Sequence, residues 1–293
     1  MEHVLAVDIG GTKMEVGVVT AGGTILERRR VASTGVDTAD ELFGRLTGLL
    51  DDVMATDAAA AVRICGVGCG GPMRRGGVGV SPINIPVWRD FALHARLIDH
   101  TGLAVHVDND AKALALGEAW KGRAQGVANF IGMVVSTGVG GGIVLDGRLL
   151  DGESGNAGHI GHVVVDPDGT DLPTHVRGVL EAEISGTGIA ARTGRPAQDA
   201  DEAERVRAGT LLGRAVGSVA NLLDLRLAVV AGSVALGFGE PFFAAAQAEI
   251  DRVADLQHST GTIIAPALLG ADGPLIGAAA VGLRGEGHDV GVR

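Results

Sequence analysis

The chain has 293 residues, a formal net charge of −11 at pH 7, and 46% apolar residues. This length suits two domains, each with a sizeable buried core. The negative charge argues against a nucleic-acid partner, because binding a phosphate backbone needs clustered Lys and Arg side chains. We therefore expect small-molecule partners, and any bound anion must be held locally by backbone amides and a cation.

Cysteine usage and hydropathy indicate a reducing compartment and no membrane partner. Cys65 and Cys69 lie in one apolar run, and we interpret them as buried thiols rather than metal ligands. The uncharged stretch at residues 126–145 is long enough to span a membrane, but it carries six glycines and reads as a loop with flanking strands. No signal-peptide pattern precedes the first apolar strand, so we expect a cytoplasmic protein.

The most informative pattern opens the chain. In residues 5–13 (LAVDIGGTK), an apolar strand delivers Asp8 to its tip, and a turn with two glycines follows. Glycines let the backbone turn so closely that its N–H groups can face a polyphosphate. A second unit of the same design lies at residues 131–142 (IGMVVSTGVGGG). One such unit alone is more often a plain hairpin, but two favour a duplicated α/β architecture that clamps a nucleotide between its halves.

The rest of the first half alternates strands and helices around one irregular segment. Residues 70–88 contain several prolines and no regular period, and long irregular segments in compact domains tend to be binding loops. The expected strands are residues 4–7, 15–19, 24–30, 64–68 and 105–107, and the expected helices are residues 39–54 and 111–120.

Three polar residues lie where a strand ends and a helix begins: Asp108, Asn109 and Asp110. Asp and Asn are favoured helix caps, so one of the three is expected to cap this helix. Two acids and an amide exceed what a cap requires. A carboxylate at a helix N-terminus stays ionised and could act as a base toward a nearby hydroxyl, so the structural and catalytic interpretations both stay open.

The second half repeats the plan of the first. We expect a glycine-rich hairpin from residue 130 to residue 145, then helices at residues 180–191 and 204–223. A strand at residues 227–230 leads into the turn at residues 231–233, and a last helix covers residues 275–283.

Five of these motifs come in the order seen in the ROK family, which the chain resembles over nearly its whole length. They are residues 8–13, 84–88, 109–111 with 117–118, 137–142, and 158–162. That family comprises bacterial sugar kinases and sugar-responsive repressors. The resemblance implies an α/β, actin-like (ribonuclease H-like) ATPase fold, with a nucleotide and sugar cleft between two domains. We place the small domain at residues 1–110, joined by the C-terminal helix at 275–293, and the large domain at residues 111–274. A homodimer is also implied.

The resemblance also implies a role for individual residues, with ATP and Mg²⁺ as cofactors. Asp110 resembles the catalytic base that takes the proton from the reacting sugar hydroxyl, and Asp8 is implied to hold Mg²⁺ through water. The implied substrate-binding residues are Gly71, Asn84, Asn109, His159, His162 and Glu181. The implied nucleotide-binding residues are Asp8, Gly10, Gly11, Thr12, Lys13, Thr137, Gly138, Gly140, Gly232 and Ser233.

The chain departs from the family in two ways. His159 stands where most of the kinases have a Glu that contacts the sugar. The family's zinc site, made of a His and three cysteines, has lost all three cysteines, since residues 172–179 read LPTHVRGV. A single His cannot fill a tetrahedral site, so we expect no zinc and interpret His162 as a hydrogen-bonded loop histidine. Residues 166–179 should then be held by packing and by Pro167 and Pro173.

Three functions are weighed. The first is an ATP-dependent hexokinase acting on the 6-hydroxyl of glucose or a related sugar, with polyphosphate as an open alternative donor. The second is a sugar-binding pseudokinase, motivated by His159 and the lost cysteines, although Asp110 and both phosphate turns argue against it. The third is a sugar-sensing regulator without a DNA-binding domain. Repressors of the family carry a helix-turn-helix before the first strand, where this chain has three residues, so we do not expect a repressor.

Overall fold

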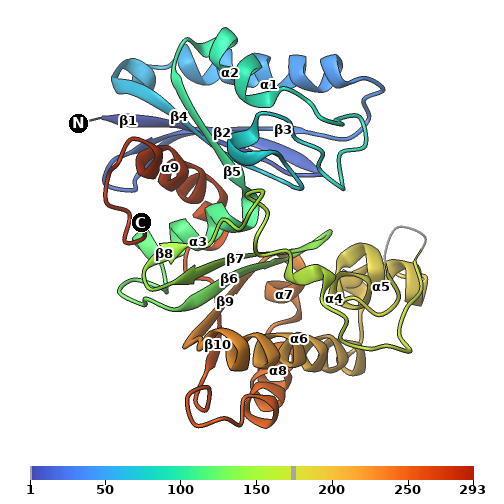
Figure 1. Cartoon of the computed structure of the whole chain (residues 1–293). Coiled ribbons are helices and arrows are strands. Elements are labelled where there is room, and N and C mark those ends of the chain that lie inside the picture. The colour runs from blue at the N-terminus through green and yellow to red at the C-terminus, as the bar shows by residue number, and fades with distance from the viewer. Residues whose placement is uncertain (1, 173–175) are drawn as a thin grey trace. The chain divides into compact units, whose positions relative to one another are not determined.

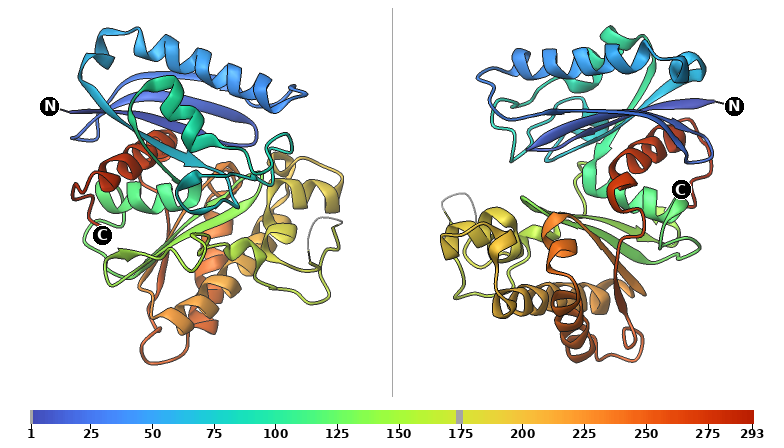
Figure 2. Two further views of the ribbon diagram at one scale, coloured as in Figure 1. Left: turned by 45° about the horizontal axis from the view of Figure 1, so that its top comes forward. Right: turned by 180° about the vertical axis from the view of Figure 1, so that it is seen from behind.

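The structure is a computed structural model that describes residues 2–172 and 176–293. Contacts divide the chain into two units. Unit 1 comprises Met1–Gln125, Asp151–Ala157 and Leu269–Arg293, and unit 2 comprises Gly126–Leu150 and Gly158–Leu268. These bounds differ from the expected division at residue 110. Helix α3 (Asp110–Lys121) belongs to unit 1, because it packs along α9 (Gly273–Gly285), as Figure 1 and Figure 2 show.

Unit 1 is built on a five-stranded mixed sheet in the order β3-β2-β1-β4-β5, with β1, β2 and β3 antiparallel and β4 and β5 parallel to β1. Helices α1 and α2 cover one face, and α9 with α3 covers the other (Figure 1). Because both faces are covered, the central strands β1 and β4 are apolar nearly throughout. The strands are β1 (His3–Ile9), β2 (Lys13–Thr20), β3 (Ile25–Ala32), β4 (Val62–Cys69) and β5 (Ala104–Asn109).

The first predicted helix is confirmed, and one helix of unit 1 was missed. Helix α1 (Ala39–Met54) begins after Thr38, whose hydroxyl accepts the N–H of Glu41. Helix α2 (Leu93–Thr101) was not predicted, because it buries only Leu93 and Leu97 and so carries a weak apolar period. The short 3-10 helices of this unit are η1 (Asp57–Ala61), η2 (Arg75–Gly77) and η5 (Gly270–Asp272).

Unit 2 repeats the topology of unit 1, which confirms the predicted duplication. Its sheet has the order β10-β9-β6-β7-β8, with β6, β7 and β8 antiparallel and β9 and β10 continuing in parallel from β6. Strand β6 therefore corresponds to β1, and the turn between β6 and β7 to the first glycine turn. The strands are β6 (Phe130–Val135), β7 (Val139–Leu145), β8 (Arg148–Leu149), β9 (Leu227–Ala231) and β10 (Ile263–Pro266).

The helices of unit 2 differ from the prediction in three places, and one is the short helix α7, where only a turn at residues 231–233 was expected. The helix expected at residues 180–191 is broken at Ser185, which is extended and caps the second piece by accepting the N–H of Gly188. Helix α8 was not predicted, although glycines on α6 allow its close approach: a Cβ at Gly209 would lie 2.2 Å from the carbonyl oxygen of Phe242. The elements are η3 (Ile160–His162), α4 (Leu180–Ile184), α5 (Gly186–Thr193), η4 (Ala197–Asp199), α6 (Glu202–Leu223), α7 (Ser233–Phe238) and α8 (Glu240–Val253).

No helix in the described part of the chain combines the length and the apolar character needed to cross a membrane.

The segment that lacks the family's cysteines is tied down by an ion pair. The buried carboxylate of Glu183 accepts hydrogen bonds from the guanidinium of Arg207 and from the N–H of Thr170. Burial opposes ionisation of Glu183, but these donors hold its pKa below the usual value. The expectation that prolines hold this segment was incomplete: Pro167 is exposed, and Pro173 lies outside the described residues.

We expect Glu183→Gln to loosen this segment. The substitution removes the charge that pairs with Arg207 and should lower the free energy of unfolding by about 1–3 kcal/mol. The matched control is Glu202→Gln, an exposed position in the first turn of α6. Thermal unfolding of both variants, with and without a chelator, provides the measurement. A melting temperature that falls on chelation, or a Glu183 variant as stable as the control, would contradict this account.

Candidate functional site

Two carboxylates meet in unit 1 around one glycine. Asp8 of β1 pairs in register with Gly68 of β4, and Asp110 begins α3 directly after β5. A Cβ at Gly68 would lie 3.6 Å from the Cα of Asp110 and 3.7 Å from Oδ1 of Asp8. Both distances are ordinary contact distances, so Gly68 marks the place where the two acids come together at this end of the sheet.

The shared position changes the acidity of Asp8. Burial is the largest cause and the negative charge of Asp110 the second, and together they raise the pKa of Asp8 to about 7, although Lys13 acts in the opposite direction. Asp8 is therefore a carboxylate that lacks sufficient positive charge nearby. Carboxylate oxygens are ligands that Mg²⁺ prefers, and Mg²⁺ sites commonly use one or two of them together with substrate phosphates. Asp8 and Asp110 fit this pattern.

The question of which residue caps α3 is settled by its hydrogen bonds. Asn109 is the N-cap, and its Oδ1 accepts the N–H of Ala111 at 3.0 Å. Asp110 Oδ1 accepts the same N–H at 2.9 Å. The amide oxygen of Asn109 thus has a structural role, whereas the carboxylate of Asp110 lies in the first turn, where the helix dipole favours negative charge.

The first glycine turn contacts the irregular loop. A Cβ at Gly11 would lie 2.6 Å from the Cβ of Asn84, so the structure brings together a predicted phosphate-binding residue and a predicted sugar ligand. The N–H of Gly10 donates to the carbonyl of Lys13 and closes the turn at 3.0 Å. Thr12 is exposed. The ammonium of Lys13 pairs with the buried carboxylate of Glu15 at 3.1 Å.

The loop that carries Gly71 and Asn84 is held in a defined shape by its own contacts. The carbonyl of Gly71 accepts the N–H of Ile83 at 3.1 Å. Trp88 is fully buried, stacks on Phe91 at 4.4 Å between ring centroids, and donates from its indole nitrogen to a carbonyl at the start of α1. The side chain of Asn84 is exposed, as a ligand-binding amide should be.

In unit 2, the second glycine turn meets the starts of two helices. The carbonyl of Thr137 accepts the Thr187 hydroxyl of α5 at 3.0 Å, and the hydroxyls of Ser136 and Ser233 are 3.0 Å apart. Gly232 has φ +104°, and a Cβ there would lie 2.2 Å from the carbonyl oxygen of Val135. The structure therefore brings Thr137 and Gly138 close to Gly232 and Ser233, all of which were predicted to bind the nucleotide.

The remaining predicted residues of unit 2 surround β7. Glu181 of α4 accepts the N–H of Val139, so its carboxylate supports the strand that leaves the glycine turn. Gly140 lies one residue further along this strand. The rings of His159 and His162 are 6.1 Å apart at an angle of 60°, with His159 half-buried and His162 exposed.

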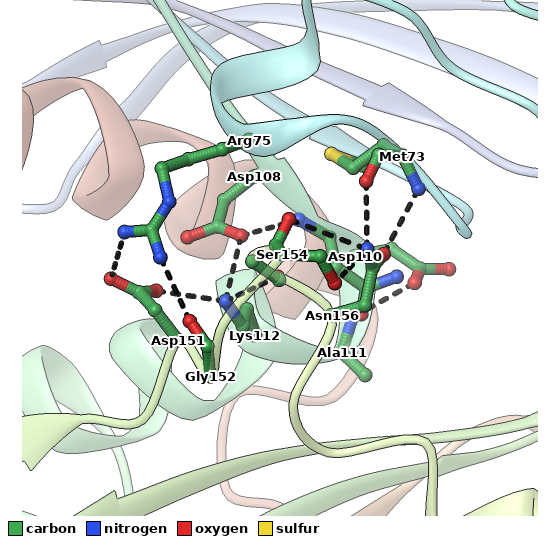
Figure 3. Close-up of polar contacts among 12 residues, drawn as sticks. Met73, Arg75, Asp108, Asp110, Ala111, Lys112, Asp151, Gly152, Ser154 and Asn156 are labelled. Carbon is green, nitrogen blue, oxygen red and sulfur yellow. Dashed lines mark hydrogen bonds and ion pairs between the residues drawn. The ribbon is translucent and has the colours of Figure 1, made fainter.

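Sequence reasoning missed two buried charged residues of unit 1. Lys112 is buried in α3 and pairs with Asp108, which precedes it in the chain, and with Asp151, which follows it (Figure 3). Glu15 pairs with Lys13, Arg28 and Arg30. The signal was present in both cases, because a charged residue within a run of apolar positions in a helix or strand is expected to have a partner.

Comparison with known proteins places the chain among sugar kinases. The sequence model of the ROK family matches residues 4–284. A glucokinase from Halalkalibacterium halodurans is 37% identical over 192 residues, which cover 64% of this chain and 57% of that protein. An N-acetylmannosamine kinase from Citrobacter koseri is 36% identical over 251 residues, covering 80% of this chain and 84% of that protein.

A solved structure agrees in fold. The ROK family glucokinase from Streptomyces griseus, in complex with glucose and AMPPNP, superposes with a TM-score of 0.82 at 26% identity, covering 96% of this chain and 99% of that chain. The family match over nearly the whole sequence and the agreement of the fold lead to the same conclusion: the chain belongs to the ROK family and has its actin-like ATPase fold.

Proposed function

We propose that this protein is an ATP-dependent sugar kinase that phosphorylates a hydroxyl of a hexose, with the 6-hydroxyl of glucose or a related sugar as the first candidate. The observation that carries the proposal is the pair of carboxylates around Gly68, one of them in the first turn of a helix. The named kinases among its relatives and the glucose and AMPPNP bound by the Streptomyces griseus enzyme support it.

Asp110 is the proposed base. A carboxylate in the first turn of a helix keeps its charge and can accept the proton of a sugar hydroxyl as that oxygen attacks the terminal phosphorus. The proposed sugar-binding residues are Gly71, Asn84, Asn109, His159, His162 and Glu181. Because most of the work in phosphoryl transfer is positioning and charge stabilisation, these neighbours should contribute chiefly by orienting the hydroxyl.

The two glycine turns are the proposed phosphate-binding elements, with Asp8 near the metal. Mg²⁺, when bound, would neutralise charge on the transferring phosphates. Asp8 would help to hold the metal, because its raised pKa shows a deficit of positive charge around it. The nucleotide would be contacted by residues from both turns and from the start of α7: Thr12, Lys13, Thr137, Gly138, Gly140, Gly232 and Ser233. The ammonium of Lys13 contacts Glu15 but is half exposed, so it has donors left for a phosphate.

The choice of sugar is the part of the proposal that depends most on single residues. Epimers and N-acyl derivatives differ by one group, and one displaced hydrogen bond decides between them. A relative that acts on glucose and one that acts on N-acetylmannosamine match this chain about equally well in identity. A panel of both sugar types, with ATP and with polyphosphate, should therefore be assayed first. Binding of sugar without turnover on the whole panel would favour a pseudokinase or a sugar-sensing regulator.

We expect Asp110→Asn to abolish most turnover while keeping the fold. Asn also caps helices, so the start of α3 should persist. Loss of the base should lower kcat by about 10²-fold to 10⁴-fold, equivalent to roughly 3–5 kcal/mol of transition-state stabilisation. Steady-state kinetics and circular dichroism on one preparation test both parts. A folded variant with kcat within tenfold of the wild type would remove Asp110 from the mechanism.

Asp8→Asn should stabilise the unliganded protein and weaken binding of Mg²⁺ with nucleotide. A folded-state pKa of about 7 exceeds the unfolded value of about 3.9, so ionising Asp8 costs stability as pH rises between these values. The variant escapes this cost. Its free energy of unfolding should exceed that of the wild type by up to about 4 kcal/mol at pH 8 and by almost nothing near pH 4.

Denaturant unfolding at both pH values measures this difference, and Asp52→Asn on the exposed face of α1 is the control. With Mg²⁺ and a non-hydrolysable ATP analogue, the wild type should gain more stability than Asp8→Asn. An Asp8 variant that is less stable than the wild type at pH 8 would show that Asp8 is well solvated or paired.

His159→Glu should change the ranking of hexoses. A neutral imidazole donates one hydrogen bond and accepts one, whereas a carboxylate only accepts, so the facing hydroxyl must change its orientation. His258→Glu, at an exposed position of the same unit, is the control. An unchanged ranking would assign His159 a purely structural role.

A further inference from the structure

The side chain of Lys112 is 1% exposed, and its ammonium lies among three oxygen atoms of unit 1 (Figure 3). Nζ lies 2.9 Å from Oδ1 of Asp151, 2.9 Å from the carbonyl oxygen of Gly155 and 3.5 Å from Oδ1 of Asp108. A buried ammonium is tolerated only when its partners have good geometry. Two carboxylates and a carbonyl supply that geometry here.

Two of these partners belong to a short segment, residues 151–157, which we call the strap. The strap follows β8 and belongs to unit 1, whereas the residues before and after it belong to unit 2. Asn156 anchors it by a pair of bonds to the backbone of Met73: its Oδ1 accepts the Met73 N–H at 3.0 Å, and its Nδ2 donates to the Met73 carbonyl at 2.8 Å. Lys112 thus holds the strap at Asp151 and at Gly155, and Asn156 adds an anchor next to Gly155.

A third contact joins the strap to the same loop. The guanidinium of Arg75 donates to the carbonyl of Gly152 at 2.8 Å and lies 3.6 Å from Oδ2 of Asp151. Met73 and Arg75 follow Gly71 closely in the chain, so the strap fixes the start of the loop that carries two of the proposed sugar ligands, Gly71 and Asn84. Figure 3 shows Asn156 of the strap beside Met73, and Lys112 of α3 beside Asp151.

The third partner of Lys112, Asp108, lies two residues before Asp110, the proposed base. Asp108 Oδ1 accepts the N–H of Asn109 at 2.8 Å and also faces Lys112. Asp108 and Lys112 therefore bracket Asp110, two residues before it and two residues after it. Any shift of the ammonium is transmitted to the junction of β5 and α3, which sets the direction of the Asp110 carboxylate.

We propose that Lys112 is a positioning residue for phosphoryl transfer: through one ammonium it aligns the junction that carries Asp110 and the strap that holds the Gly71 loop. Lys112 itself does not touch the substrate. This inference rests on the proposed kinase function, and it adds a residue that links Asp108, four residues before it, to a strap about forty residues after it.

The test compares Lys112→Met with Lys121→Met, the same substitution at the other end of α3, where the ammonium lies over the ring of Trp120. For Lys112→Met we expect kcat to fall at least tenfold when measured well below the melting temperature, with KM for MgATP within twofold of the wild type. The control should retain kcat within twofold. A purely structural lysine would lower the melting temperature of the folded enzyme without lowering kcat.

A second variant guards against loss of folding. Asp151→Asn keeps the volume and a hydrogen-bond acceptor for Lys112, so kcat should fall in the same direction but less. Because the two residues act as a unit, Lys112→Met combined with Asp151→Leu should be no slower than Lys112→Met alone. Full additivity of the two losses in kcat would overturn the coupling.

Amide hydrogen exchange supplies a readout that does not need activity. Exchange at Met73 and at residues 151–157 should be faster in Lys112→Met, with α1 unchanged. If the wild type phosphorylates no hexose of the panel, the proposed function fails, and the exchange data alone decide whether Lys112 fastens the strap. Unchanged exchange of the strap, or an unchanged kcat in a folded Lys112→Met protein, would overturn the inference.

Discussion

The arrangement of unit 1 depends on placing two like charges at one end of a sheet. Asp8 and Asp110 come from positions about a hundred residues apart in sequence, and they meet because β1, β4 and β5 run parallel and end together. Burial and the charge of Asp110 raise the pKa of Asp8 to about 7. This is an unfavourable state for a protein without ligand, and it is the state that a bound divalent cation would relieve.

Glycines make the close approaches that such a site needs. Gly68 leaves room beside the two carboxylates, Gly11 allows the first turn to meet Asn84, and Gly232 lies against the backbone of Val135. A Cβ at Gly11 or Gly232 would collide with neighbouring atoms, and one at Gly68 would lie tightly against the Cβ of Ala113. The chain has 48 glycines, and these three lie where the chain passes close to neighbouring residues of the site.

Buried ion pairs fasten the loops around these elements. Glu183 with Arg207 ties down the segment that lacks the family's cysteines, and Lys112 with Asp108 and Asp151 ties the strap to α3. Each pair joins residues from different elements. A buried charge is costly without its partner, so removal of one partner from either pair would destabilise the arrangement of its loop.

The sequence by itself determined the local elements and the motifs. Helix α1, the two glycine turns and a cap among residues 108–110 follow from periodicity, from glycine pairs and from cap preferences, all of which act over a few residues. The hydrogen bonds of the structure then identify Asn109 as that cap. The break at Ser185, the weak period of α2, and helix α8 were not predicted, because tertiary contacts decide them. Only the tertiary structure revealed the strap and its contacts with Lys112, because an ion pair depends on distance in space. Nothing within a few residues of Lys112 indicates Asp151 as its partner.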